Sequence, residues 1–333
     1  MDSLTQIVLG AAVGEMVLGK KVGNKAMLYG AIAGTIPDLD TLAGHFVDTV
    51  SALEIHRGFT HSIVFSLAFA PLFGWLVSKI ERRSPARWKE WSRLFFWGLL
   101  THPLLDAFTT WGTQLFWPLD LRLDFRAIFV IDPLYTLPFL ILLILAMRQD
   151  RESVKRRRYT LWGLGVSSAY LLLGLGLKGL ANHRFKEALE EQGIEYLQLE
   201  TKPAPFNNIL WTANVEVSDA YLIGDHSFFD TRPITFDRYP KNHALLGDLA
   251  SQDKLKRLIS VARGWYTINQ EPGGLFFNDL RFGVLDSRSG NPNFVFSYQI
   301  LENQGELEIK EVVRRPEEAK QLLLDLGRRI MGN

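Results

Sequence analysis

The sequence predicts an α-helical membrane bundle of about six spans, followed by a soluble α+β domain with a mostly antiparallel sheet. Up to about residue 181, apolar runs near the ~20 residues needed to cross a bilayer alternate with short basic segments. Beyond His183 the chain becomes more polar, and six strand-like segments with aromatic and β-branched residues follow: 209–217, 221–229, 265–270, 276–286, 294–301 and 306–313. We therefore expect a membrane domain over residues 1–181 and a second domain over residues 182–333.

Six apolar segments are the expected spans: 4–19, 26–36, 62–80, 94–116, 130–147 and 161–180. The first two are weaker signals, because the first contains Glu15 and the second is short. Their small residues would let two helices approach closely in lipid, as packed spans or as a re-entrant pair. The third, fifth and sixth segments are nearly free of charged residues and are the strongest of the predicted spans.

The basic residues predict an orientation. With six crossings, the basic clusters around residues 20–25, 82–93 and 148–158 share one side, which the positive-inside rule makes cytoplasmic. The N-terminus, the loops 37–60 and 112–129 and the domain 182–333 then lie outside. We expect a multi-pass membrane protein with an extracytoplasmic C-terminal domain.

Composition limits the chemistry. The net charge of +1 gives no reason to expect a nucleic-acid partner. The chain has no cysteine, so disulfides and thiolate ligands are excluded. A bound divalent metal would be held by His, Asp or Glu, which favours zinc, manganese or iron.

One apolar segment carries two ionisable residues four positions apart, His102 and Asp106. Residues at this spacing share a helix face, and such groups in an apolar span are expensive unless paired. Asp38 and Asp40 follow the end of the second span, just beyond Pro37. The third span begins with two more histidines, and all these residues lie toward the outer side in the predicted topology. We expect a metal site with ligands from His56, His61, His102, Asp106, Asp38 and Asp40.

Three polar residues are expected beside these ligands. Gln6 lies at the outer end of the first span and can reach the site as a ligand or a hydrogen-bond donor. Arg57 can bind an anionic group such as phosphate. Asp132 opens the fifth span and either orients a ligand histidine or caps its helix.

Four stretches carry a family resemblance: the opening fifteen residues, Pro37-Asp-Leu-Asp40, His56-Arg-Gly-Phe-Thr-His-Ser62 and Thr101-His-Pro-Leu-Leu-Asp106. They resemble one bacterial family of inner-membrane, metal-dependent hydrolases, one relative of which is described as LexA-binding. That family is distantly similar to zinc-dependent phospholipase C and P1 nuclease, and the resemblance covers roughly residues 1–135. It implies a zinc-type hydrolase site in the bacterial inner membrane. Gln6 departs from the pattern, since many relatives have histidine there, and the histidines are fewer than a three-metal site uses.

The leading hypothesis is therefore a metal-dependent hydrolase. A metal ion lowers the pKa of bound water toward ~7, and whichever of Asp38 and Asp40 is not a ligand would serve as general base. The expected partners are the lipid bilayer and a lipid-like or envelope substrate, such as a phosphoester. Two alternatives are an ion or metal transporter, and a non-catalytic membrane scaffold with a structural metal.

Overall fold

The computed structural model describes residues 1–286, 293–303, 306–312 and 319–333. The chain forms two compact units that interleave along the sequence. The first comprises Met1–Ala43, Ile55–Leu177 and Pro205–Asn207, and the second comprises Gly44–Glu54, Lys178–Ala204 and the described part of Asn208–Asn333.

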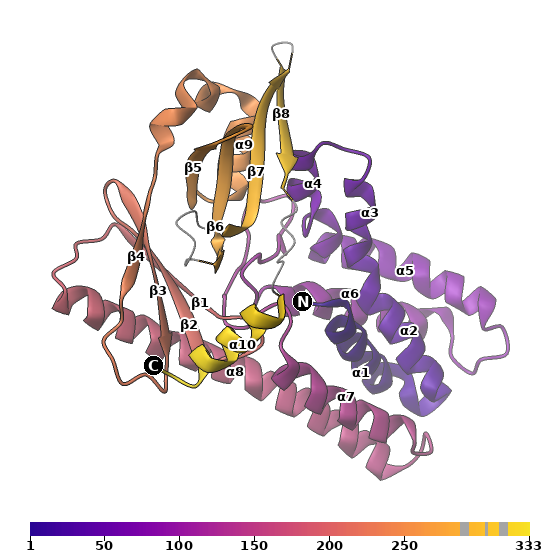
Figure 1. Cartoon of the computed structure of the whole chain (residues 1–333). Helices are drawn as coiled ribbons and strands as arrows, with labels where there is room; N and C mark the ends of the chain where they lie inside the picture. Colours follow the sequence, from indigo (N-terminus) through magenta and orange to yellow (C-terminus); the bar gives the residue numbers. More distant parts are fainter. Residues whose placement is uncertain (287–292, 304–305, 313–318) are drawn as a thin grey trace. The chain divides into compact units, whose positions relative to one another are not determined.

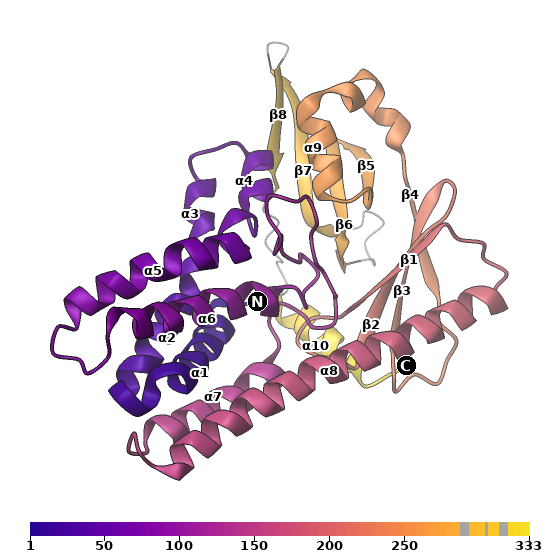
Figure 2. The ribbon, with the colours of Figure 1, turned by 180° about the vertical axis from the view of Figure 1, so that it is seen from behind.

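The first unit is built from helices, which Figure 1 shows in indigo to magenta. Its elements are α1 (Ser3–Val22), α2 (Asn24–Thr35), the 3-10 turn η1 (Ile36–Leu39), α3 (Asp40–Gly44), the 3-10 turn η2 (Phe59–His61), α5 (Ile63–Ile80), α6 (Trp88–Asp106), α7 (Pro133–Met147) and the first part of α8 (Val154–Glu191). In Figure 2, α7 runs beside the beginning of α8.

Small residues bring α1, α2 and α6 into close contact. A Cβ added at Gly10 or Gly14 of α1 would overlap the backbone oxygen of Gly30 or Ala26 in α2. On the other side, a Cβ at Gly98 of α6 would overlap an alanine of α2. Glycine therefore allows backbone-to-backbone packing here, and the C-terminal end of α2 lies against α6.

The prediction of about six spans was wrong. Among the described residues, two helices are long and apolar enough to cross a membrane: α5, with a mean hydropathy of 1.8, and α8, with 1.5 over its most apolar window. Two of the other predicted spans are too short. Helix α2 has 12 residues and α7 has 15, so they are only about 18 and 22 Å long, against a hydrocarbon core of ~30 Å.

The other two predicted spans fail for different reasons. Helix α1 contains Glu15 and ends in Lys20 and Lys21, so it is too polar for a span. Helix α6 ends at Asp106, ten residues before the predicted end of that segment, and its first turns carry charged residues. The apolar residues after Asp106 belong to a loop.

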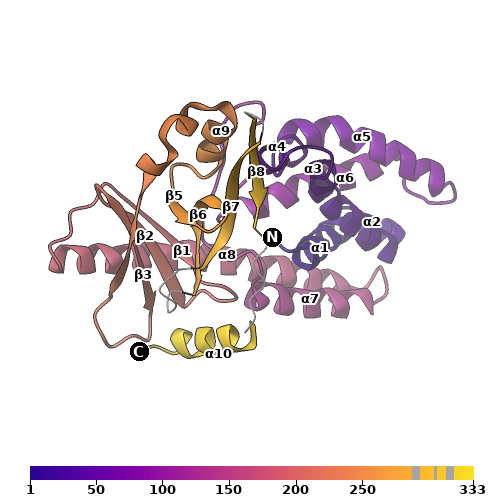
Figure 3. The ribbon, with the colours of Figure 1, turned by 45° about the horizontal axis from the view of Figure 1, so that its top comes forward.

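The second unit contains two antiparallel four-stranded sheets, where the sequence analysis expected one (Figure 3). The first sheet has the order β1 (Gln198–Pro203), β2 (Leu210–Glu216), β3 (Ala220–Ser227), β4 (Phe236–Pro240). The second has the order β5 (Tyr266–Glu271), β6 (Gly274–Asp286), β7 (Asn293–Asn303), β8 (Glu306–Glu311). Strands β1 and β4 had not been predicted, because both are short, contain proline and are largely polar.

Helices cover these sheets. The 3-10 segment η3 (His243–Ser251) and α9 (Asp253–Val261) lead into β5, and Leu255 and Leu258 of α9 pack with the aromatic core of the second sheet. Val50 of α4 (Thr49–Ile55) belongs to the same core, and Glu54 pairs with Arg257 at 2.5 Å. The final helix is α10 (Ala319–Ile330).

A buried ion pair joins two helices of the first unit. Arg156 of α8 donates to both carboxylate oxygens of Glu15 in α1, at 2.6 and 2.5 Å, and to the side chain of Asn24 at 2.8 Å. Both charged side chains are almost fully buried. Glu15 is thus held by a residue of another helix, far away in the sequence.

We predict that Arg156→Ala destabilises the protein by about 3–5 kcal/mol, because it leaves Glu15 buried and uncompensated. Thermal unfolding in detergent would measure this. The matched control is Arg157→Ala, at an exposed position of the same helix, and the double variant Glu15→Gln/Arg156→Met should recover much of the loss. Equal melting temperatures for Arg156→Ala and Arg157→Ala would contradict the prediction.

Candidate metal centre

Two short turns present the first three polar groups. Helix α2 ends at Thr35, and Pro37 lies in the following 3-10 turn, where it interrupts regular helical hydrogen bonding. Asp38 lies in that turn with about a quarter of its side chain exposed, and Asp40 starts α3 with its side chain buried. His61 ends η2 and is fully buried.

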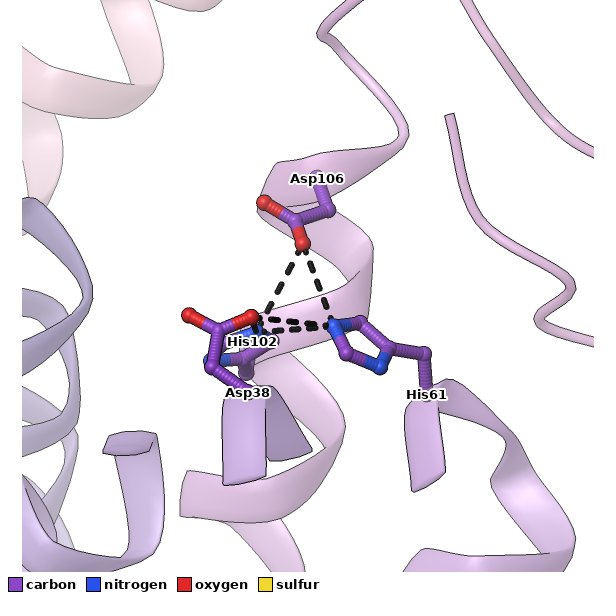
Figure 4. Close-up of side chains that lie close together, drawn as sticks. All are labelled: Asp38, His61, His102 and Asp106. Carbon is purple, nitrogen blue, oxygen red and sulfur yellow. Dashed lines mark hydrogen bonds and ion pairs between the residues drawn. The ribbon is translucent and has the colours of Figure 1, made fainter. Parts of the chain in front are cut away.

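Helix α6 supplies the remaining two side chains of the group. His102 and Asp106 lie one turn apart near its end and are both buried. As their spacing predicts, they face the same way, and each approaches His61. Figure 4 shows the four side chains converging from η1, η2 and α6.

Four ligand-type atoms meet at this point: Asp38 Oδ1, His61 Nε2, His102 Nε2 and Asp106 Oδ2. The two Nε2 atoms are 3.1 Å apart. The four nitrogen-to-carboxylate distances are 3.3, 3.4, 3.4 and 3.5 Å. All four atoms lie within 4.8 Å of one another.

These separations match a metal site. Four tetrahedral ligands at zinc distances of 2.0–2.1 Å lie about 3.3 Å from one another. Five of the six separations are close to this value. Asp106 Oδ2 is buried without a hydrogen bond, and it faces the two imidazoles and the guanidinium of Arg57. The donor set therefore fits a divalent cation with nitrogen and oxygen ligands.

The outer nitrogen of each imidazole is already committed. His102 Nδ1 lies 2.6 Å from the backbone oxygen of Gly34 and must donate a proton to it, because a carbonyl only accepts. His61 Nδ1 lies 3.0 Å from Thr60 Oγ1 and 3.4 Å from Asp40 Oδ2. In the neutral rings, both Nε2 lone pairs then point into the site, as in histidines that bind metals.

The electrostatics of the turns also favour a cation. Burial alone lowers the pKa of His61, but the neighbouring carboxylates of Asp106, Asp38 and Asp40 outweigh it and raise the pKa to about 9. Burial raises the pKa of Asp38, yet hydrogen bonds from His102 and His61 hold it well below its usual range. The site thus keeps its carboxylate ionised and takes up positive charge.

Two of the predicted neighbours hold Asp106. Gln6 donates to Asp106 Oδ1 at 3.0 Å and to the backbone oxygen of His102 at 3.2 Å. Arg57 Nε lies 3.2 Å from Asp106 Oδ2, and its guanidinium donates to Thr109 at 2.8 Å. The α-amino group of Met1 also contacts Asp106. Arg57 therefore serves a carboxylate of the site, where the sequence suggested an anionic ligand.

Asp132 lies elsewhere. It caps α7 by accepting from the backbone of Leu134 at 2.9 Å, and it accepts from the hydroxyl of Tyr170 at 2.9 Å. Of the two roles proposed from the sequence, the structure shows the helix cap.

Asp40 and His56, both expected as ligands, stand beside the four-residue group. Asp40 accepts from the backbone N–H of Arg57 at 2.8 Å and from Thr60 at 3.2 Å, and it lies 3.1 Å from His56 Nδ1. Its two oxygens therefore orient His56 and His61 together. The His56 side chain is about a quarter exposed, and its ring centre lies 6.1 Å from that of His61.

Two of these contacts, from Thr60 and from the carbonyl of Gly34, were not predicted from the sequence. Thr60 lies inside the quoted motif, so a hydroxyl next to His61 was a visible signal. The carbonyl of Gly34 had no signal at all, because any residue type supplies a backbone oxygen. Its place beside His102 follows from the packing of α2 on α6.

We predict that the purified protein binds zinc and that His102→Ala abolishes binding, because it removes a buried nitrogen donor. Asp40→Asn should weaken binding about 10- to 100-fold and leave the stoichiometry unchanged, since Asp40 only orients His61. Competition with a chromophoric chelator would measure both. His183→Ala, on the exposed face of α8, is the control, and unchanged affinity in His102→Ala would contradict the assignment.

Comparisons with known proteins place the chain among bacterial membrane proteins. It is 34% identical over 106 residues to the inner membrane protein YbcI of Escherichia coli (strain K12), which covers 30% of this chain and 57% of YbcI. The chain thus spans little more than half the length of this curated relative. No solved structure matches it. The family model for the YdjM inner membrane protein matches residues 1–181, more than half of the chain, so this protein belongs to the YdjM inner membrane protein family.

Proposed function

We propose that the protein is a metal-dependent hydrolase of the inner membrane that acts on a lipid-like or envelope substrate, such as a phosphoester. The observation that carries the proposal is the convergence of Asp38, His61, His102 and Asp106 at tetrahedral spacing. The absence of cysteine and the two imidazole and two carboxylate donors favour zinc, with manganese or iron as alternatives.

A bound zinc ion would supply a water molecule acidic enough to act as a nucleophile near neutral pH. His61, His102 and Asp106 are fully buried and would hold the ion in a fixed position. Asp38 is the exposed corner of the group, so its carboxylate would bind the ion at the open side. Arg57 and Gln6 keep Asp106 in place.

His56 is suited to proton transfer. Asp40 holds its Nδ1, which fixes the ring and leaves Nε2 as the atom that exchanges a proton, as in other carboxylate–imidazole pairs. Its partial exposure allows a substrate to reach it. The sequence predicted a catalytic role for Asp40. Both of its oxygens orient other groups, chiefly His56 and His61, so we assign Asp40 a positioning role.

We propose that α5 and α8 anchor the protein in the membrane, so that the metal centre lies at the membrane surface beside the start of α5. Residues 82–93, after α5, and residues 148–158, at the start of α8, are rich in lysine and arginine, so the positive-inside rule puts both ends in the cytoplasm. The residues after α8 would then lie outside.

We predict that His56→Gln lowers hydrolysis by about 10²- to 10⁴-fold, the usual contribution of a general acid or base, while zinc content stays unchanged. Turnover of short-chain and long-chain phosphoesters, assayed beside the metal content of the same sample, would test this. Wild-type protein with full zinc and no turnover on any lipid or phosphoester would favour a structural metal in a membrane scaffold. The burial of three of the four ligands is what favours that alternative.

The orientation can be tested because the chain has no cysteine. We predict that a cysteine at position 191, introduced as Glu191→Cys, reacts with a membrane-impermeant maleimide in spheroplasts. Asp150→Cys, also at an exposed position, should react only after the membrane is permeabilised. The reverse pattern would contradict this orientation of α8.

A further inference from the structure

The loop between α6 and α7 has an apolar tip. Four large side chains of this tip, Phe116, Trp117, Leu119 and Leu121, are 43%, 37%, 64% and 50% exposed. Leu115, next to them, is buried. A run of this size exposed to water is unusual, and such patches mark contact with a membrane or another apolar surface.

The base of the same loop is bonded to the turns that hold the metal centre. Thr113 and Leu123 pair through two backbone hydrogen bonds of 2.9 and 2.8 Å and close the loop. The backbone N–H of Gln114 donates to the oxygen of Arg57 at 3.0 Å, and the hydroxyl of Thr113 donates to the oxygen of His61 at 3.3 Å.

Two polar side chains of the loop make hydrogen bonds beside the tip. The side chain of Gln114 donates to Asp120 at 3.3 Å, and Arg122 donates to the backbone oxygen of His56 at 3.3 Å. The loop is therefore amphipathic: its polar groups hold the turns that carry His56 and His61, and its apolar groups face outward.

The apolar tip continues a surface of α5. The rings of Trp117 and Phe59 pack edge to face, with their centres 4.9 Å apart. The ring of Phe59 in turn packs against Phe65 and Phe69 of α5, with centre-to-centre distances of 5.4 and 6.2 Å. Helix α5 is one of the two candidate spans, and it exposes apolar residues such as Leu67. Tryptophan beside the end of a span is typical of the membrane–water interface.

We infer that the tip, residues 116–121, inserts into the boundary of the lipid bilayer beside the start of α5 and thereby holds the metal centre at the level of the lipid head groups. Occupation by lipid is favoured because the tip is continuous with α5 in a protein of an inner-membrane family. The insertion of the tip does not depend on catalysis. If the proposed function holds, insertion has a consequence for the substrate, which would reach the site from the membrane and not from water.

The test uses the full-length chain in vesicles of phosphatidylethanolamine and phosphatidylglycerol. Leu119→Cys and Leu121→Cys each give a unique site for a nitroxide label, and the exposed Asp150→Cys is the control. Labels at 119 and 121 should collide more with oxygen than with a water-soluble nickel complex, and the label at 150 should show the opposite. A water-like label at 119 would overturn the inference, as would a label shielded from both reagents by protein. Zinc content, measured in each variant, verifies folding.

A second variant separates insertion from catalysis. Leu119→Asp/Leu121→Asp should raise KM for a bilayer-embedded phosphoester about tenfold or more, since it removes two apolar side chains from lipid. It should leave zinc content and turnover of a water-soluble short-chain phosphoester unchanged. Equal losses on both substrates would overturn the inference. If the wild-type protein has no turnover, the proposed function fails, and the nitroxide measurement still decides whether the tip inserts.

Discussion

The Nε2 atoms of His61 and His102 lie 3.1 Å apart, and the opposite nitrogen of each ring is committed to a hydrogen bond. Two lone pairs at this separation, with Asp106 Oδ2 buried beside them, favour a cation between them. The carboxylates of Asp106, Asp38 and Asp40 also raise the pKa of His61 to about 9, which is the same preference for positive charge. A cation at this point would offset the cost of burying the group.

The geometry of the group depends on close backbone packing. Glycines at the contact between α1 and α2 and between α2 and α6 bring the carbonyl of Gly34 to His102. The same approach places Gln6 of α1 against Asp106. A side chain at Gly34 would overlap the backbone of α1, so its small size matters as much as its carbonyl.

Asp40 organises the other half of the site. One carboxylate holds the backbone of Arg57, the hydroxyl of Thr60 and the imidazoles of His56 and His61. Arg57 itself has a positive φ of 60°, an unusual conformation for a residue with a side chain. Its hydrogen bond to Asp40 holds this bend, which turns the guanidinium toward Asp106. A division of roles follows, in which Asp38 faces the open side and Asp40 fixes the surroundings.

The sequence by itself determined the local features of the protein. The spacing of His102 and Asp106 put both on one helix face, the apolar runs identified α5 and α8, and alternation located six of the eight strands. Periodicity reports only on neighbouring residues, so it overcounted the spans and missed the division into two sheets. Which nitrogens and oxygens face one another was decided by the tertiary structure, because those contacts join residues tens of positions apart. The placing of His56 on Asp40 and of Glu15 on Arg156 arises in this way. Each depends on how helices pack, and no spacing in the sequence records that packing.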